Sequence, residues 1–385
     1  MEATQIYSLV NSVNKQMWGE DAIAVHDLTG LISLGEQVFS SETDRDKFLG
    51  ILADRIGKTI FRNLDIEVEF PEFIRNEFEW GAILSKINVQ VVPAQSNESW
   101  NVGADGFTPN QFKIDKPVVY QSLFKGVLTW EYDLTVPDTL YRSAFLGESQ
   151  FASFVSGLMG AQSDSLTLAI NNMSHMALAN LCAEKIKNEN GVVNLLSLYN
   201  DTVTTPITAE DAMTTPDFYR YAGMVMRNYI KYLAQPSKLY NIGIGDDKML
   251  RATARDNLHV IINSDFASGF DTFLTADTFN RDLAQLPLYR EFVSIQGTGT
   301  TAPNFTDNTT INIKPSSGGD AIVQSGIVGI YADRQAIGTF YNDRFTATDR
   351  NNRNRYTNYT SGCSIGWFND LSESAVIFVI ADTGE

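Results

Sequence analysis

Residues 148–188 read ESQFASFVSGLMGAQSDSLTLAINNMSHMALANLCAEKIKN, and this stretch decides the fold. Its apolar residues, from Phe151 to Ile186, recur with the 3.6-residue period of an α-helix. At 1.5 Å per residue, the spacing predicts one helix of roughly ten turns and about 60 Å. Between the glutamates near its two ends, Asp164 is the only charged residue. A solvated helix face normally carries charges, so we expect a neighbouring surface to cover this helix.

The chain before this helix has the two-residue period of β-strands as far as about residue 135. One strand places Ile87, Val89 and Val91 on a single face. Another groups Leu128, Trp130, Tyr132 and Leu134. Residues 94–112 are rich in Gly, Asn, Ser and Pro. The piece from about 94 to 135 therefore predicts a long hairpin without a core of its own, which needs another surface to lie on.

The chain after the helix changes to a mixed α/β pattern from about residue 190. Thr215-Pro216-Asp217 begins a predicted helix at 216–234, because proline is favoured in the first helical turn. Continuous apolar runs then predict buried strands at Leu258–Ile262, Ile327–Tyr331 and Ala375–Ala381. Of these, the last has the strongest β character, so we expect a sheet covered on both faces.

The N-terminal region is acidic and helical. Ile6, Val10 and Val13 lie on one stripe of a helix that ends near Gly19, and a second helix is predicted at 43–62. Over residues 1–80, 7 basic and 15 acidic side chains give 7 − 15 = −8, nearly half of the chain's net charge of −17.

The composition excludes several classes of protein. With 46 Asp and Glu against 29 Lys and Arg in 385 residues, the overall field repels phosphate, so charge-driven binding of nucleic acid by the whole surface is excluded. Two cysteines cannot build a disulfide framework, and no basic-apolar leader opens the chain, so we expect a protein kept in a reducing cytoplasm. The uncharged interval Ser165–Ala183 contains Asn171, His175 and Asn180, which argues against a membrane span.

Motifs that carry chemistry are matched only formally. Gly362-Cys363-Ser364-Ile365-Gly366 spells a nucleophile elbow, but the last histidine is His259 and only 19 residues follow the motif. Residues 297–302 fit G-x-G-x-x-A, yet Pro303 follows where a helix should begin. The histidines stand in no metal-ligand spacing. We therefore predict no catalytic residue, no cofactor and no metal.

Two charged groups leave alternatives open. Asp246 and Asp247 are compatible with an acidic site of a metal-dependent enzyme, although solvated loop positions explain them as well. A basic cluster stands out in this acidic chain, and it is either a solvated hairpin or a contact with acidic surface on a neighbouring subunit. Its members are Arg344, Arg350, Arg353 and Arg355, beside Asp343 and Asp349.

The order of these segments resembles the major capsid proteins of tailed bacteriophages, which have the Hong Kong 97-type fold, along nearly all of the chain. The stretch 326–338, GIVGIYADRQAIG, is similar to a strand and turn near the end of many such proteins. The resemblance implies an α+β fold built from an N-terminal arm, an extended β-hairpin loop, a peripheral domain with a long spine helix, and an α/β axial domain. Its implied boundaries are 1–80 for the helical arm, 81–147 for strands and extended loop with the hairpin at about 107–135, 148–215 for the peripheral domain with the spine helix at 148–188, 216–340 for the axial domain, and 341–385 for C-terminal strands returning to the peripheral domain.

The same resemblance implies a structural protein without enzymatic activity. Copies would assemble as pentamers and hexamers into an icosahedral shell of the virion, formed in the host bacterial cytoplasm and enclosing double-stranded DNA without binding it specifically. Its implied partners are further copies of itself, a separate scaffolding protein, a portal and decoration proteins, with no membrane. Residues predicted at contacts between subunits are Trp130, Tyr132, Leu158, Met173, Arg344, Arg350, Arg353 and Arg355.

Two other interpretations remain at this level. An encapsulin-like compartment would share the fold and would hold a cargo protein in place of DNA. A cytoplasmic α/β enzyme would be a monomer or small oligomer and would lose activity on substitution of Asp246 or Asp247. The hairpin and the weakly charged helix favour a subunit clamped by its neighbours over a monomeric enzyme, because both elements expose surface that a monomer leaves uncovered.

Overall fold

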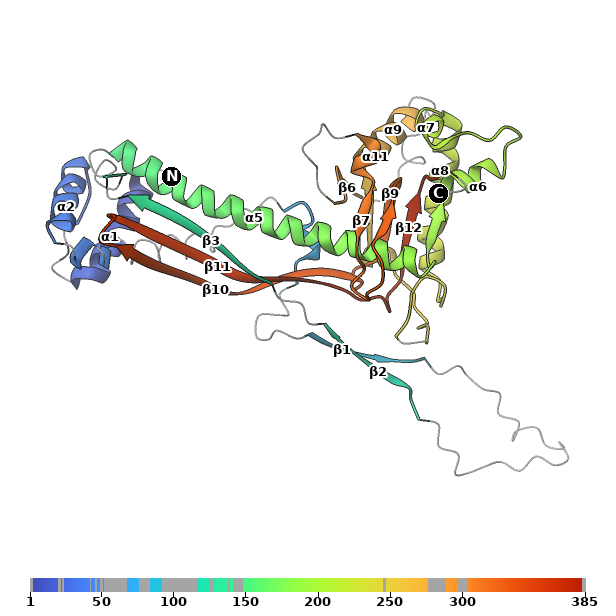
Figure 1. The fold of residues 1–385 in the computed structure, drawn as a ribbon, viewed down its shortest axis with the longest axis horizontal. Coiled ribbons are helices and arrows are strands. Elements are labelled where there is room, and N and C mark those ends of the chain that lie inside the picture. Colours follow the sequence, from blue (N-terminus) through green and yellow to red (C-terminus); the bar gives the residue numbers. More distant parts are fainter. Residues whose placement is uncertain are drawn as a thin grey trace. The chain divides into compact units, whose positions relative to one another are not determined.

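The computed structural model describes residues 3–19, 22, 24–41, 43–45, 47–48, 51, 68–75, 84–91, 116–124, 128–137, 139–140, 148–244, 247–275, 289–296 and 304–382. The chain divides into two compact units (Figure 1). Unit 1 comprises Met1–Glu79, Val127–Met173 and Thr339–Gly366, and unit 2 comprises Trp80–Gly126, Ser174–Gly338 and Trp367–Glu385. The 40-residue helix α5 (Glu148–Lys187) contributes to both units, and it confirms the helix predicted at 148–188.

Unit 1 combines short helices, one sheet and the first part of α5. Its three-stranded sheet has the order β10-β11-β3. The remaining bounds are α1 Ala3–Trp18, α2 Leu28–Ser40, the 3₁₀-helix η2 Pro71–Phe73, β3 Leu128–Pro137, β10 Ile337–Asn351 and β11 Tyr356–Asn369. Helix α1 buries Val10 and Val13 as its stripe predicts, whereas α2 was not predicted. Most of the helix predicted at 43–62 lies outside the described residues.

The sheet of unit 1 packs one face on α5. Strand β3 pairs antiparallel with β11, so that Trp130 lies opposite Cys363 and Leu128 opposite Ile365. The side chains of Trp130, Cys363 and Ile365 meet Leu166 and other apolar residues of α5 in a buried cluster. The alternate residues of β3 lie on the exposed face, among them Glu131, Asp133 and Thr135. The two-residue period of this strand therefore correctly predicted which side chains share a face.

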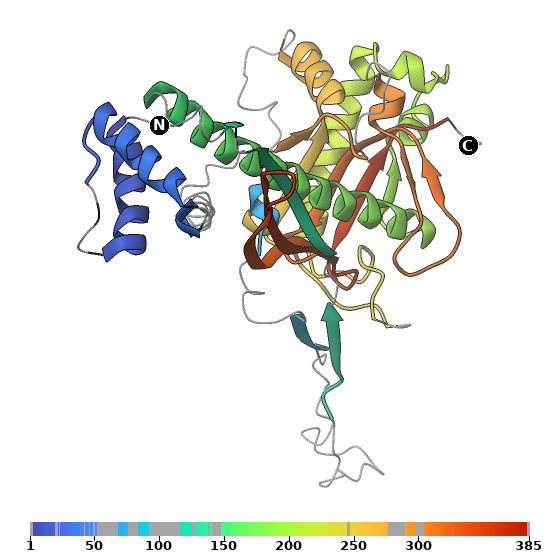
Figure 2. The same ribbon diagram turned by 60° about the vertical axis from the view of Figure 1, so that its left-hand side comes forward.

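Unit 2 contains a mixed five-stranded sheet, two two-stranded sheets and several helices (Figure 2). The elements additional to α5 are β1 Leu84–Val89, β2 Val119–Phe124, β4 Val192–Asn194, α6 Leu195–Asn200, α7 Ala209–Ala212, α8 Pro216–Leu233, η5 Arg255–Asn257, β5 Leu258–Asn263, α9 Ser264–Thr275, β6 Arg290–Phe292, α11 Phe305–Asn308, β7 Ile311–Ile313, β8 Ile322–Gln324, β9 Ile327–Asp333 and β12 Ala375–Val379.

The five-stranded sheet has the order β4-β12-β9-β5-β6 and forms the core of unit 2. Tyr331 of β9 and Phe378 of β12 pack edge to face at 4.8 Å between ring centroids, in a cluster with side chains of α6, α8 and α9. Ile330 and Ile377, which point to the other side of the sheet, are also fully buried. Burial on both faces explains why β9 and β12 read as continuous apolar runs, as predicted.

Three predicted boundaries need correction. Residues 107–135 do not form one hairpin, because β2 pairs with β1 in unit 2 while β3 pairs with β11 in unit 1. The α/β pattern begins near residue 190 as predicted, but the axial-domain boundary at 216 is too late, since Leu196 and Tyr199 of α6 belong to the same core. Residues 341–385 do not stay together, because most of β10 and β11 lies in unit 1 whereas β12 inserts between β4 and β9 in unit 2. Alternation identifies strands, but it does not identify their partners, and this limitation explains these errors.

Candidate assembly surfaces

The β1–β2 hairpin has an inner face that contacts the rest of unit 2. In the antiparallel register, Asn88 lies opposite Tyr120 and Lys86 opposite Ser122 on this face. The Lys86 ammonium donates to the Asp370 carboxylate at 2.6 Å. The Tyr120 hydroxyl donates to the Asp247 carboxylate, and this hydrogen bond raises the pKa of Tyr120. The inner face is therefore mainly polar.

The outer face of the same hairpin is exposed and mainly apolar. Val89 lies opposite Val119. Ile87 and Leu123 follow on this face, opposite Gln121 and Ser85, and the Gln121 amide donates to the Ser85 hydroxyl at 2.8 Å. The exposed fractions are 67% for Ile87, 56% for Val89, 62% for Val91, 53% for Val119 and 62% for Leu123. Contiguous exposed aliphatic groups mark an interaction surface, whereas single ones do not. We call these five residues the outer apolar face.

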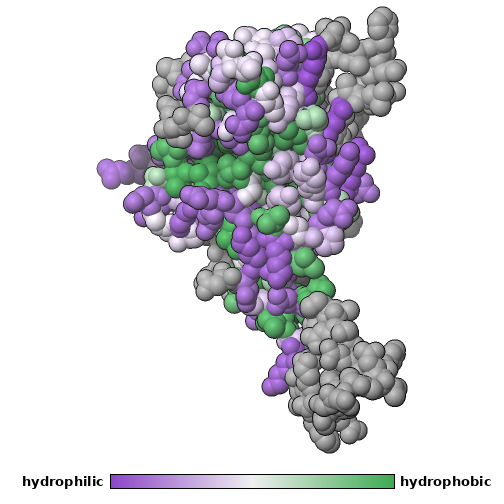
Figure 3. All heavy atoms as spheres, turned by 90° about the vertical axis from the view of Figure 1, so that its right-hand side faces the viewer, coloured by the Kyte–Doolittle hydropathy of each residue, from purple (hydrophilic) through white to green (hydrophobic). Residues whose placement is uncertain are grey.

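Exposed apolar side chains occur elsewhere on unit 2 as well. In Figure 3, hydrophobic side chains gather in patches between hydrophilic ones on the face that is shown. Large exposed examples are Met224 at 52%, Tyr232 at 50%, Leu239 at 67% and Val323 at 66%. Among the described strands, only the β1–β2 hairpin combines an exposed apolar face with a polar inner face.

A loop behind the hairpin is fixed to the end of α5 through Lys185, whose side chain is fully buried. Its ammonium nitrogen donates to the carbonyl of Tyr240 at 2.6 Å and to Asn190 Oδ1 at 3.1 Å. Burial, together with the positive charge of Lys248, lowers the pKa of Lys185 to about 7. A lysine in an unfolded chain has a pKa near 10.5, so folding and protonation of Lys185 oppose each other.

The stability of unit 2 is therefore expected to rise with pH. Between pH 7 and 9 the unfolded chain keeps a proton that folded Lys185 releases, which favours the folded state by about 2 kcal/mol over this interval. In Lys185→Met this contribution disappears, so the pH dependence of its unfolding free energy should be shallower by that amount. Urea unfolding at both pH values measures the difference. Lys187→Met is the control, because it removes an exposed lysine two residues further along the chain. It should keep the wild-type dependence of the unfolding free energy on pH. The same pH dependence in all three proteins would contradict the prediction.

The residues predicted at subunit contacts have different surroundings. Trp130 and Met173 pack against the apolar cluster between α5 and its sheet, and Tyr132 stacks on Trp130 at 6.4 Å between ring centroids. All of these are half-buried within unit 1. Leu158 lies in α5, and its side chain is outside the described ones. The structure thus brings Trp130, Tyr132 and Met173 together, and their role between subunits stays a prediction.

The arginine cluster lies at and near the turn between β10 and β11. Arg353 and Arg355 are exposed, whereas Arg350 is half-buried and donates to Asn352 Oδ1 at 2.7 Å. The side chain of Arg344 is outside the described ones. Arg355 has φ 54°, a left-handed conformation that costs a residue with a side chain about 1 kcal/mol.

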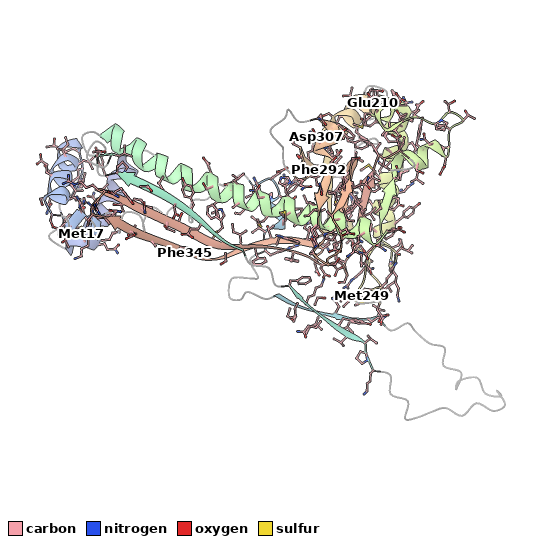
Figure 4. All side chains as sticks on the ribbon, viewed as in Figure 1. Met17, Glu210, Met249, Phe292, Asp307 and Phe345 are labelled. Atoms are coloured by element: carbon pink, nitrogen blue, oxygen red, sulfur yellow. The ribbon has the colours of Figure 1, made fainter. Side chains whose placement is uncertain are left out.

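Phe345, labelled on β10 in Figure 4, lies over Gly362 of β11.

The formal catalytic motifs have no catalytic surroundings. Ser364 lies within β11, a continuous strand, and not on a strand-to-helix turn. Asp247 holds Tyr120 of the hairpin, and Asp246 lies outside the described residues. In the described ranges, no three His, Cys, Asp or Glu side chains come together as metal ligands would. The helices in this part of the chain include none with the length and apolar character of a membrane span.

Sequence reasoning grouped the members of β1 correctly but did not single out the outer apolar face as a site. The available signal was the alternation of Ile87, Val89 and Val91 with Lys86 and Asn88. That combination defines an amphipathic strand, but it does not state which face is covered.

Comparisons with known proteins agree on one family. The family model described as Phi29-like phage major capsid protein matches residues 10–364. The major capsid protein of Bacillus phage PZA is 19% identical over 384 residues, which cover 98% of this chain and 74% of that protein. A solved structure described as the capsid of Staphylococcus phage Andhra has a TM-score of 0.51 at 10% identity and covers 83% of this chain and 88% of its own. This last likeness shows a shared α+β capsid fold.

The family model spans nearly the whole chain, from the first helix to the strand β11. Members of this family are structural components of the virion, so the capsid interpretation is confirmed over the compartment and enzyme alternatives. The chain belongs to the Phi29-like phage major capsid protein family, and it is a major capsid protein of a tailed phage.

Proposed function

We propose that this chain assembles as hexamers and pentamers into a closed icosahedral shell around double-stranded DNA, and that the outer apolar face of its hairpin makes the decisive contact with the next copy. The observation that carries this proposal is the exposure of four aliphatic side chains on a two-stranded sheet, with that of Val91 just beyond β1. Such a sheet is marginally stable alone, and covering its apolar face stabilises it in proportion to the buried area.

A second copy of the chain is the proposed occupant of this face. In a closed shell, one surface patch on each subunit meets a different patch on its neighbour, and the contact repeats around every ring. The weakly charged side of α5 suits the receiving patch, because Leu168 is 62% exposed in a stretch whose only charge is Asp164. Leu158 and Met173 belong to the same helix, Trp130 packs against it from the sheet, and Tyr132 stacks on Trp130.

The arginines at the β10–β11 turn form a second proposed contact. Arg353 and Arg355 are exposed cations in a chain of net charge −17, so acidic surface on a neighbouring copy is complementary to them. Arg350 belongs to the same turn and Arg344 to the strand before it. Complementary charges of this kind contribute mainly to the orientation and rate of association.

The architecture is proposed to follow the Hong Kong 97-type plan with corrected boundaries. Helix α5 is the spine helix, the unit built on the five-stranded sheet is the axial domain, and α1 and α2 belong to the N-terminal arm. Strands β1 and β2 belong to the extended loop. The remaining proposed partners are a separate scaffolding protein, a portal and decoration proteins.

The packaged DNA is proposed to be enclosed without specific binding. The chain carries a net charge of −17, and its first 80 residues contribute −8 of it. An acidic inner wall repels phosphate and leaves DNA free to move during packaging and ejection. A strongly basic inner wall in the assembled shell would contradict this part of the proposal.

The first test is the size of the purified protein, alone and mixed with the products of neighbouring genes. Light scattering and negative-stain microscopy should show closed shells or rings of five and six subunits. A stable monomer or dimer under all these conditions would contradict assembly by this chain.

A further inference from the structure

Four charged side chains meet where β1 contacts the rest of unit 2. The Lys86 ammonium lies 2.6 Å from Asp370 Oδ2 and 2.5 Å from Glu373 Oε1. The Arg251 guanidinium reaches the same Glu373 oxygen at 3.2 Å. The group therefore contains two cations and two carboxylates and has no net charge. We call these four residues the charge cluster.

The charge cluster is largely removed from water. The exposed fractions of the side chains are 21% for Lys86 and for Arg251, 3% for Asp370 and 8% for Glu373. The second oxygen of Asp370 also accepts hydrogen bonds from the amide and hydroxyl of Ser372, at 3.0 and 2.6 Å. Because each carboxylate is buried and hydrogen-bonded, removal of one cation leaves a charge that water does not compensate.

The charge cluster joins the hairpin to two loops that are themselves fixed. Arg251 donates to Asn88 Oδ1 at 2.6 Å, so it contacts the hairpin at a second point. Its loop is closed by hydrogen bonds between the Asn241 side chain and the backbone of Met249, at 2.7 and 3.1 Å. The turn carrying Asp370 begins with a hydrogen bond from its amide to the carbonyl of Ala336, at 2.8 Å. Both loops are held in place by their own hydrogen bonds, so the hairpin is the part that moves when this contact breaks.

Apolar contact adds little on the inner face of the hairpin. Phe124 at the end of β2 lies 5.2 Å from the ring of Phe368, and the other described contacts of this face are polar. Hydrogen-bonded charge pairs fix direction, since their geometry is narrow, whereas aliphatic contacts permit sliding. The core of the five-stranded sheet is apolar and contains none of the four charged residues.

We propose that the charge cluster is a latch that sets the position of the β1–β2 hairpin on unit 2, separately from the stability of the core. Lys86, Arg251, Asp370 and Glu373 act as positioning residues. When the latch holds, the outer apolar face has one fixed direction. When a cation is lost, the hairpin separates from unit 2 while the five-stranded sheet stays folded. The consequence for assembly rests on the proposed function, but the latch itself can be tested on the unassembled chain.

Amide hydrogen exchange on the unassembled full-length protein tests the latch. In Lys86→Met, exchange in Leu84–Val89 and Val119–Phe124 should accelerate by at least about tenfold, while exchange in β9 and β12 keeps its wild-type rate. Glu373→Gln keeps the shape of the side chain and removes its charge, so it should accelerate the same strands. In the double variant, the acceleration of exchange should be smaller than the two single effects combined, because both changes disrupt one contact.

Arg220→Met is the matched control, because it breaks a 2.7 Å pair with Asp217 on α8, away from the hairpin. It should leave exchange in the hairpin unchanged. Unchanged exchange in both latch variants would overturn the proposal. Acceleration spread equally over the hairpin, β9 and β12 would also overturn it, since the cluster would then stabilise the whole unit. If wild-type protein forms no shells while the hairpin still loosens, the latch stands and the proposed function fails.

Discussion

Ile87→Asp is expected to abolish shell formation while leaving the subunit folded. Ile87 is 67% exposed in the isolated chain, so an aspartate there stays hydrated, and the free energy of unfolding should change by less than about 0.5 kcal/mol. In the shell the same carboxylate would be buried against apolar groups of the next copy, at a cost of several kcal/mol per contact. Because the contact repeats in every subunit, the yield of closed shells should fall by at least about tenfold. Light scattering measures the yield, and urea unfolding measures the stability.

Val323→Asp is the matched control for this experiment. Val323 is 66% exposed and also lies on a two-stranded antiparallel sheet of unit 2, but its neighbours do not form an apolar face. The control should form shells at the wild-type yield. Normal shells from Ile87→Asp would show that the outer apolar face is not a subunit contact.

Gly326→Ala is expected to cause the largest loss of stability. Gly326 precedes β9 with φ 73°, and an added Cβ would lie 2.0 Å from the carbonyl oxygen of Ile380. That carbonyl belongs to the backbone that follows β12, and the amide of Ile380 donates to the Gly326 carbonyl at 2.8 Å. The added methyl group would therefore force two central strands apart. The left-handed backbone conformation adds a further cost for alanine. We expect a loss of about 4 kcal/mol in the free energy of unfolding, with most of the protein insoluble.

Gly318→Ala separates the two causes of this loss. Gly318 has φ 87°, but an added Cβ would meet no atom within 4 Å. Its unfolding free energy should fall by only about 1 kcal/mol, the cost of the backbone conformation alone. Chemical unfolding and soluble yield compare the variants, and equal losses at the two glycines would refute the steric explanation.

Long periodic elements could be predicted from the sequence because their signal is local. Helix α5 has the predicted bounds to within one residue, and α8 begins at Pro216 as predicted. Strands β9 and β12 follow from continuous apolar runs, which identify a sheet buried on both faces. Helix α2 was missed, although Asp27 caps it by accepting a hydrogen bond from the Gly30 amide at 2.8 Å.

The candidate surfaces could be predicted only in part. The sequence predicted that Trp130 and Tyr132 share a face, and their rings stack in the structure. They lie on β3, however, and not on the hairpin to which the sequence assigned them. The charge cluster unites residues separated by as many as 287 positions, such as Lys86 and Glu373. No periodicity relates such distant residues, so the sequence provides no signal for this contact.

The sequence by itself determined the α+β class, the long weakly charged helix, the acidic character and the resemblance to phage capsid proteins, because these depend on composition, order and local period. Only the tertiary structure decided that β1 pairs with β2 and that Lys86 and Asn88 face inward while Ile87 and Val89 face outward. An alternating strand has two chemically distinct faces, and its own residues do not state which one is covered. The choice is made by the partners of the polar face, Asp247, Arg251, Asp370 and Glu373, which fold toward it from distant parts of the chain.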